Sequence, residues 1–248
     1  MKIQKLLQLL RDNAAGERAP LNLVRNEAEK SATLFIYDVI DPWYGVSAEQ
    51  VGKTLMGLDP DTTLHLRINS PGGDVFEGRA IRTHIAQFAG KTIAHVDGLA
   101  ASAATTIADG ADEVEIVDGG FFMIHNGWTI SLGDKSELRK TADLLEKVDG
   151  AIVADYAKRT GVDVEQLVAW MNAETWFSAD EAVANGFATR KAPEASKEAK
   201  NSSKRWNLTA YDKVPKALVQ TPAPPSDEPD YAAQRAHNLR RMQVLQFA

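Results

Sequence analysis

Residues 98–105 read Gly98-Leu99-Ala100-Ala101-Ser102-Ala103-Ala104-Thr105 and place one serine among residues with very small side chains. Small residues allow a neighbouring backbone or a ligand to approach closely. Two interpretations fit this stretch. It is a tightly packed helix whose serine bonds back to a main-chain carbonyl, or it carries a nucleophilic serine with room for a substrate beside it. The eight residues alone favour the packed helix, so the decision depends on the sequence around them.

The composition is that of an ordinary globular protein, with 248 residues of which 44% are hydrophobic and 25% are charged. The net charge is −6, although the chain from Arg190 onward holds eleven Lys or Arg against six Asp or Glu. The acidic body argues against nucleic-acid binding. The absence of cysteine excludes disulfides, thiolate metal sites and a cysteine nucleophile. The apolar run at 6–10 is too short for a signal peptide, and no stretch reaches the roughly 18 apolar residues of a membrane span. We therefore expect a cytoplasmic protein with no membrane partner.

Strand and helix patterns alternate along the chain, which predicts an α/β fold with a mostly parallel sheet. Strands are expected at 33–40, 64–69, 92–96, 113–117 and 121–125, and helices at 48–57, 75–89, 98–109, 135–159, 163–170 and 179–186. We divide the chain into an N-terminal arm at 1–30, one domain at 31–190 and a tail at 191–248. The tail holds six of the ten prolines and is expected to be largely disordered. Short helices are expected at 3–11 and 232–247.

Several segments, taken in order, resemble the ClpP family of serine proteases. Ile68-Asn69-Ser70-Pro71-Gly72-Gly73 resembles the family's oxyanion-hole turn, residues 98–103 resemble its nucleophile motif, and Phe122-Met123-Ile124-His125 resembles the strand that delivers its catalytic histidine. Residues 156–161, 176–182 and 185–187 continue the match, which covers about 32–190. The resemblance implies a ClpP/crotonase-like fold of repeated β-β-α units with a protruding strand-helix handle.

A serine hydroxyl is a weak nucleophile at neutral pH and needs a neighbouring base. A histidine suits that role because its pKa lies near the working range. The resemblance implies that Ser102 is the nucleophile and His125 the base. It also implies that the backbone amides of Gly72 and Ala103 bind the oxyanion and that a substrate strand lies beside Gly73. No metal or organic cofactor is needed for this chemistry.

Glu174 stands where the family usually has the aspartate of the triad. Glutamate can orient a histidine, as Ser-His-Glu triads show. Its extra methylene group changes its reach, so Asn172 or a main-chain carbonyl is an alternative partner of the imidazole ring.

The N-terminal arm, the glutamate and the Pro-rich basic tail look most like phage ClpP-related head-maturation proteases. That resemblance implies activity in a bacterial host cytoplasm, inside a prohead, on scaffold, capsid or portal proteins and in some members on the protease itself. It also implies a homo-oligomeric ring formed through the 126–159 handle. Three alternatives stay open: a housekeeping ATP-dependent Clp protease proteolytic subunit, a crotonase-like acyl-CoA enzyme, and a catalytically inactive structural subunit.

Overall fold

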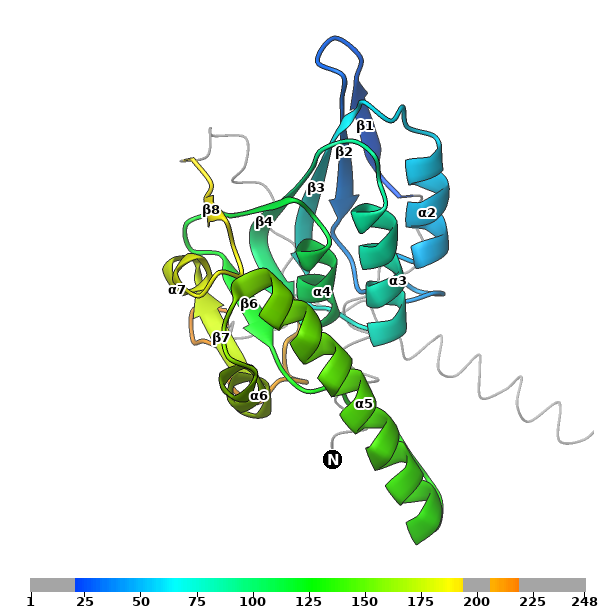
Figure 1. The fold of residues 1–248 in the computed structure, drawn as a ribbon, viewed down its shortest axis with the longest axis vertical. Coiled ribbons are helices and arrows are strands. Elements are labelled where there is room, and N and C mark those ends of the chain that lie inside the picture. The colour runs from blue at the N-terminus through cyan, green and yellow to red at the C-terminus, as the bar shows by residue number, and fades with distance from the viewer. Residues whose placement is uncertain (1–20, 194–205, 219–248) are drawn as a thin grey trace, which may run out of the picture. The chain divides into compact units, whose positions relative to one another are not determined.

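The computed structural model describes residues 21–193 and 206–218, and within these residues the chain forms an α/β structure around one sheet (Figure 1). Its strands are β1 Leu23–Asn26, β2 Ser31–Ile36, β3 Thr63–Ser70, β4 Thr92–Ala101, β5 Glu113–Ile116, β6 Phe121–Ile124, β7 Thr175–Ser178 and β8 Arg190–Lys191. They are arranged in the order β1-β2-β3-β4-β5-β8, and β6 pairs with β4 and β7. The β1–β2 and β6–β7 pairs are antiparallel and the other pairs are parallel. The predicted α/β fold with a mostly parallel sheet is confirmed.

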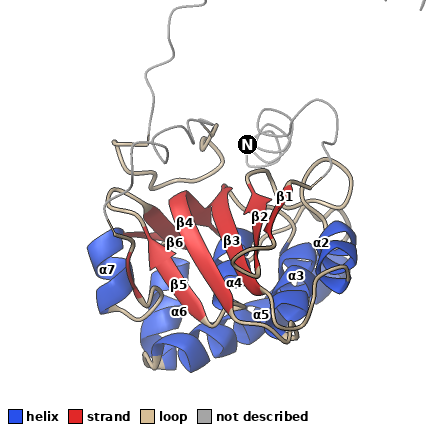
Figure 2. Cartoon of the chain, turned by 90° about the horizontal axis from the view of Figure 1, so that it is seen from above, coloured by secondary structure: helices blue, strands red, loops and turns tan. Residues whose placement is uncertain are grey.

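The helices gather on one face of the sheet (Figure 2). They are α2 Ala48–Met56, α3 Val75–Ala86, α4 Ala103–Asp109, α5 Lys135–Thr160, α6 Val164–Asn172 and α7 Ala179–Ala184. Local sequence explains where several of them begin. Ser47 with Gln50 and Ser178 with Glu181 form complete capping boxes, which satisfy main-chain N–H groups at the starts of α2 and α7.

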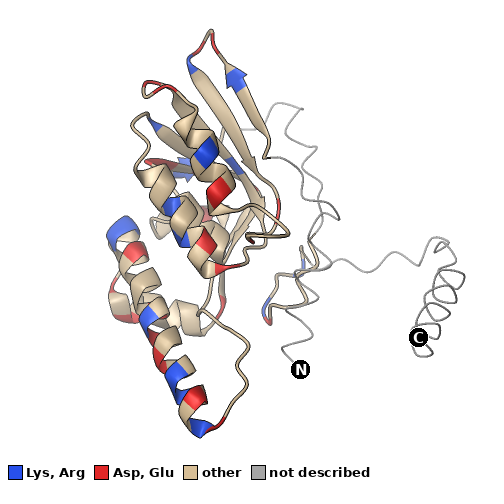
Figure 3. Ribbon diagram, turned by 90° about the vertical axis from the view of Figure 1, so that its right-hand side faces the viewer, with Lys and Arg blue, Asp and Glu red and all other residues tan. Residues whose placement is uncertain are grey.

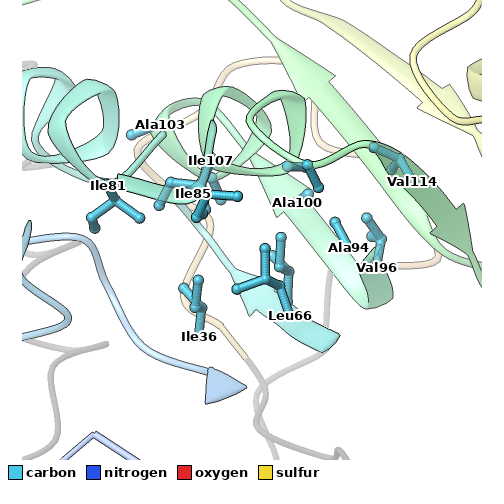
Figure 4. Packing of buried hydrophobic residues seen from close by; sticks show 14 of the residues in the cluster. Ile36, Leu66, Ile81, Ile85, Ala94, Val96, Ala100, Ala103, Ile107 and Val114 are labelled. Carbon is cyan, nitrogen blue, oxygen red and sulfur yellow. The ribbon is translucent and has the colours of Figure 1, made fainter. Parts of the chain in front are cut away.

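The core lies between the sheet and helices α3 and α4 (Figure 4). Alternate residues of the central strands point to this side, as period-2 patterning requires. Ile36, Leu66 and Val96 of the sheet belong to one buried cluster with Ile81 of α3 and Ile107 of α4, and all five side chains are fully buried. Each such side chain contributes roughly 1.5–3 kcal/mol when it leaves water. This packing fixes β4 and α4, the two elements that flank Ser102.

The segment before Ser102 is a strand, which corrects the predicted helix over 98–109. β4 continues through Gly98 to Ala101 because Leu99 and Ala101 pair with Phe121 and Met123 of β6. The strand changes partner along its length, from β5 in its first half to β6 in its second. Only the part after Ser102 is helical, as α4.

Two predicted boundaries also differ. β1 lies inside the predicted arm at 1–30 and pairs with β2, so the sheet begins before residue 31. The predicted strand at 33–40 ends at Ile36, and Ile40 instead makes isolated bridges to Val46 and Gly73. The helices predicted at 3–11 and 232–247 lie outside the described residues.

The predicted handle is a loop followed by a helix, since residues 126–134 form neither strand nor helix. Helix α5 has 26 residues and is therefore about 39 Å long. It extends beyond the rest of the domain in Figure 1, and positions of charged residues are frequent along its ribbon in Figure 3. Its buried residues, Ile152, Val153 and Tyr156, lie in the C-terminal half, while Leu138 and Leu144 are exposed.

Candidate active site

Ser102 and His125 meet at one edge of the sheet. Ser102 follows β4 and His125 follows β6, and these neighbouring strands run parallel, so their carboxyl ends lie together. The His125 Nε2 atom is 2.8 Å from the Ser102 Oγ atom. A base at this distance can accept the hydroxyl proton. The structure thus brings together the two residues that the sequence predicts as nucleophile and base.

Ser102 is held in an unusual backbone conformation, with φ 54° and ψ −122°. Its N–H donates to the Met123 carbonyl at 2.9 Å, and its carbonyl accepts hydrogen bonds from the Thr105 N–H at 2.9 Å and the Thr105 Oγ1 at 2.6 Å. Thr105 Oγ1 also lies 2.5 Å from the hydroxyl of Tyr156, whose pKa is raised to about 12 by burial. These contacts tie Ser102 to β6 and α5.

The glycine turn before α3 lies directly against Ser102. Gly72 and Gly73 have φ angles of 88° and 150°, a range that favours glycine. A Cβ atom on Gly72 would be 2.9 Å from the Ser102 Cβ, and one on Gly73 would be 2.1 Å from the Ile40 carbonyl oxygen. Glycine is therefore required at both positions for the turn to reach the site.

The predicted oxyanion donor Gly72 directs its amide elsewhere. Its N–H donates to the Ser70 Oγ at 3.2 Å, while the Ser70 hydroxyl donates to the Asp38 carbonyl at 2.6 Å. Gly73 and Ala103, in contrast, line a cavity of about 250 Å³ together with Ser102 and His125. The geometry therefore favours Gly73 over Gly72 as the partner of Ala103.

The rest of this cavity is mainly apolar. Side chains from α3, from the loop after β6 and from α5 form its wall, namely Val75, Phe76, Trp128, Leu145, Val148 and Ile152. A cavity of this kind beside a nucleophile accommodates an apolar side chain of a bound ligand.

Glu174, the predicted third member of the triad, lies near His125, but its carboxylate is bonded to other groups. It accepts hydrogen bonds from the Trp176 Nε1 at 3.1 Å and from the main-chain N–H groups of Asp212 and Lys213 at 2.9 and 2.6 Å. His125 and Glu174 do line the same second cavity, of about 320 Å³. Within the described residues, the hydrogen bonds of the Glu174 carboxylate therefore go to Trp176 and the tail rather than to His125.

The alternative partner Asn172 is also bonded to another residue. Its Oδ1 atom accepts a hydrogen bond from the Asn126 Nδ2 at 2.7 Å. Asn172 lines the same second cavity as His125.

Residues 206–213, which we call the docked segment, contact the site although they lie in the predicted tail. Trp206 Nε1 donates to the Asn69 Oδ1 at 3.2 Å, and the Tyr211 hydroxyl donates to the Pro71 carbonyl. The Tyr211 ring packs on His125 with centroids 5.4 Å apart. Burial and the nearby Glu174 raise the pKa of Tyr211, and a hydrogen bond with Ser102 partly offsets that rise. The sequence signal for this contact is a Trp, a Leu and a Tyr within six residues of the tail.

Two negative findings apply to residues 21–193 and 206–218. No group of three or more His, Cys, Asp or Glu residues in this part of the chain is arranged to hold a metal ion. None of its helices combines the length and the apolar composition of a membrane span.

Comparison with known proteins finds Clp proteases both in sequence and in fold. Residues 20–191 match the family described as Clp protease. The chain is 30% identical over 132 residues to ATP-dependent Clp protease proteolytic subunit 2 of Tropheryma whipplei (strain Twist). The aligned stretch covers 52% of this chain and 73% of that protein. It is also 30% identical over 144 residues to the ATP-dependent Clp protease proteolytic subunit of Leuconostoc citreum (strain KM20), over 54% of this chain and 68% of that protein. The structure of a point mutant of ClpP1 from Listeria monocytogenes superposes with a TM-score of 0.58 at 25% identity, covering 67% of this chain and 93% of that one.

Proposed function

Since the chain belongs to the Clp protease family and is a serine-type peptidase, we propose that Ser102, His125 and Glu174 are its catalytic residues. The observation that carries this proposal is the 2.8 Å contact between the Ser102 Oγ and the His125 Nε2. It joins the ends of two neighbouring strands, and both residues stand in the motif order of the family.

Peptide-bond hydrolysis would follow from these positions in two steps. The Ser102 Oγ attacks the carbonyl carbon while the His125 Nε2 takes the hydroxyl proton. When the tetrahedral intermediate collapses, the C–N bond breaks and His125 returns the proton to the leaving amine. Water, activated by the same histidine, then releases the acyl group and restores the Ser102 hydroxyl. Glu174 would stabilise the imidazolium ion in both steps.

Two backbone amides would bind the oxyanion, those of Ala103 and Gly73. Both residues line the cavity that contains Ser102, whereas the Gly72 amide is bonded to Ser70. Donors of this kind stabilise charge that develops only in the transition state. We expect the substrate to bind as an added strand beside Gly73, with an apolar side chain in the cavity walled by α3 and α5.

The relatives favour a ring-forming proteolytic subunit over a head-maturation enzyme. Both sequence relatives described above are proteolytic subunits of ATP-dependent Clp proteases. We accordingly propose that this chain cleaves peptides within a homo-oligomeric ring, and the role in phage head maturation stays a prediction that these relatives do not support. The Ser102–His125 pair favours a protease over a crotonase-like acyl-CoA enzyme, since the latter chemistry does not need this pair.

Labelling with a fluorophosphonate reagent tests the proposal. We expect the reagent to modify Ser102 in the full chain, and we expect the Ser102→Ala variant to lose both the label and peptide cleavage. Ser136→Ala, which changes an exposed serine on α5, is the matched control and should retain both. Undiminished peptide cleavage by Ser102→Ala would refute the assignment, and tight binding of a CoA thioester in its place would favour the acyl-CoA alternative.

A further inference from the structure

We propose that the docked segment, residues 206–213, is an autoinhibitory element that covers the catalytic histidine and holds the Glu174 carboxylate away from it. This inference rests on the proposed function, because it assigns Glu174 a catalytic role once the segment has left.

The segment is attached to the site at three separate points. Trp206 bonds to Asn69 at the end of β3, Tyr211 bonds to Pro71 in the glycine turn, and the amides of Asp212 and Lys213 bond to Glu174 before β7. Asn69 and Pro71 are close to each other in sequence, whereas Glu174 lies about a hundred residues further along the chain, so the segment joins two parts of the site that are far apart in sequence. A segment without a role at the site would not need to contact all three.

The segment presents a side chain to the catalytic pair. The Tyr211 ring lies at 90° to the imidazole of His125, and it packs at 82° against the indole of Trp176, with centroids 5.8 Å apart. Tyr211 is itself buried, with 7% of its surface exposed. A substrate would have to place a peptide carbonyl at Ser102, but the group that contacts His125 here is an aromatic ring. The arrangement is therefore that of an inhibitor rather than that of a bound substrate.

The contact with Glu174 gives the segment a second effect. Two neighbouring main-chain N–H groups converge on one carboxylate, and hydrogen bonds to an ionised acceptor are stronger than neutral ones. Trp176 Nε1 donates to the same carboxylate. While these bonds are intact, the carboxylate is directed to the tail and not to His125, although both residues line the cavity of about 320 Å³. Release of the segment would remove two of the three bonds and leave the carboxylate able to turn to the imidazole.

The test compares the rate of fluorophosphonate labelling between variants. If the form without the docked segment is a minor population, its fraction limits the observed rate of labelling. A variant in which the segment has left the site should therefore be labelled at least about tenfold faster. We expect this increase for Tyr211→Ala and for a chain that ends at residue 205, which serves as a second variant should Tyr211→Ala fold poorly. Thr209→Ala is the matched control, because Thr209 is exposed and its side chain bonds only within the segment, to Asn207.

A synthetic peptide with the sequence of residues 206–214 should restore inhibition when added to the shortened chain. The same peptide with Ala in place of Tyr211 should not. Labelling of the full chain at the same rate as both opened variants would overturn the proposal and leave the proposed function standing.

Hydrogen exchange separates the two hypotheses. In the inactive Ser102→Ala chain, we expect the amides of Asp212 and Lys213 to be protected and to lose protection in Ser102→Ala/Tyr211→Ala. Fast exchange of these two amides in both chains would show that the segment does not dock, whether or not the chain is a protease. A third outcome is that the two amides are protected as expected but that the reagent labels neither Tyr211→Ala nor the chain that ends at residue 205. That result would overturn both the proposed function and the inhibitory role.

The capture of Glu174 has its own measurement. In the Tyr211→Ala background, Glu174→Gln should lower kcat by roughly 10²–10⁴ and change KM little, as expected for a residue that stabilises the imidazolium ion. An unchanged kcat would overturn the claim that the segment inhibits by holding Glu174.

Discussion

Ser102 lies in a region of backbone conformation that glycine adopts readily and other residues do not. Replacing it by alanine removes the hydroxyl but keeps the Cβ atom and the strain. Replacing it by glycine removes the hydroxyl, the Cβ atom and the strain. We therefore expect Ser102→Gly to have a free energy of unfolding about 1 kcal/mol higher than that of Ser102→Ala, measured by chemical denaturation of the two inactive chains.

Ala142 provides the control for this comparison. It is exposed in the middle of α5, where backbone angles are ordinary. Ala142→Gly should lower the free energy of unfolding by about 1 kcal/mol. If glycine is the less stable residue at position 102 as well, the backbone of Ser102 is not strained.

At the scale of single residues, motif order was sufficient to predict that Ser102 and His125 lie together. The resemblance implied the Gly72 amide as an oxyanion donor, but it could not show that this amide donates to the Ser70 hydroxyl, which itself donates to the Asp38 carbonyl. The hydrogen bonds of Glu174 could not be predicted from the sequence either, since two of their three donors lie nearly forty residues away in the tail.

Strands β3 and β4 carry a pair of histidines on the face opposite the core. His65 Nδ1 lies 2.9 Å from His95 Nε2, and His95 Nδ1 lies 2.9 Å from the Glu115 carboxylate. Burial lowers the pKa of both histidines below the ordinary value of 6.5. The charged groups that face the pair are Glu29, Arg67, Lys91, Glu115 and, through Glu115, Arg190.

This pair predicts a loss of stability in mild acid. As the pH falls below about 6.5, the unfolded chain binds protons that the folded pair still excludes, so the free energy of unfolding decreases. The decrease ends once the pH has passed the lowered pKa values of the folded state. The neighbouring Glu113 is still charged in this range, because ion pairs with Lys91 and Arg190 lower its pKa to about 2.

Denaturation at a series of pH values between about 7.5 and 5 would measure the effect. The double variant His65→Gln/His95→Gln should show a flatter dependence than the unmodified chain. His84→Gln, which changes an exposed histidine on α3, should leave the slope as it is. A slope that persists in the double variant would assign the proton uptake to other groups.

At the scale of elements, the predicted helices and strands correspond to observed ones wherever the local pattern was strong. The error at 98–101 has a physical cause. Gly-Leu-Ala-Ala has helical composition, but pairing with β6 and β3 holds these residues in a strand. Alanine and glycine are used there for close approach to Gly72 rather than for helix propensity, and this tertiary constraint leaves no local signal.

For the whole molecule, the least predictable feature is the docked segment. Its residues lie in a Pro-rich, basic region whose composition is typical of disorder. The contacts that hold it join Trp206 to Asn69 and Tyr211 to Pro71, more than 130 residues apart. Only the folded site brings these partners together, so no local pattern could place the segment there.

The handle leaves apolar side chains uncovered in the single chain, and a ring of subunits would cover them. Leu132 is 86% exposed and Leu144 is 53% exposed, and Trp128 and Ile130 are also partly uncovered nearby. Adjacent exposed apolar residues of this kind mark an association surface. Trp128, Ile130 and Leu132 lie in the loop that follows His125, so association through this loop and α5 would also support the wall of the cavity beside Ser102.

We therefore expect Leu132→Asp to shift the protein from a ring to smaller species, because each subunit contact would lose the roughly 1.5–3 kcal/mol of a buried leucine and gain the cost of a buried charge. Light scattering after size-exclusion chromatography measures the mass directly. Met56→Asp is the matched control: Met56 is 81% exposed at the end of α2, away from the handle, and its replacement should leave the mass unchanged. An unchanged mass for Leu132→Asp would place the subunit contact elsewhere. A reduced mass with full peptidase activity would show that the active site does not depend on the ring.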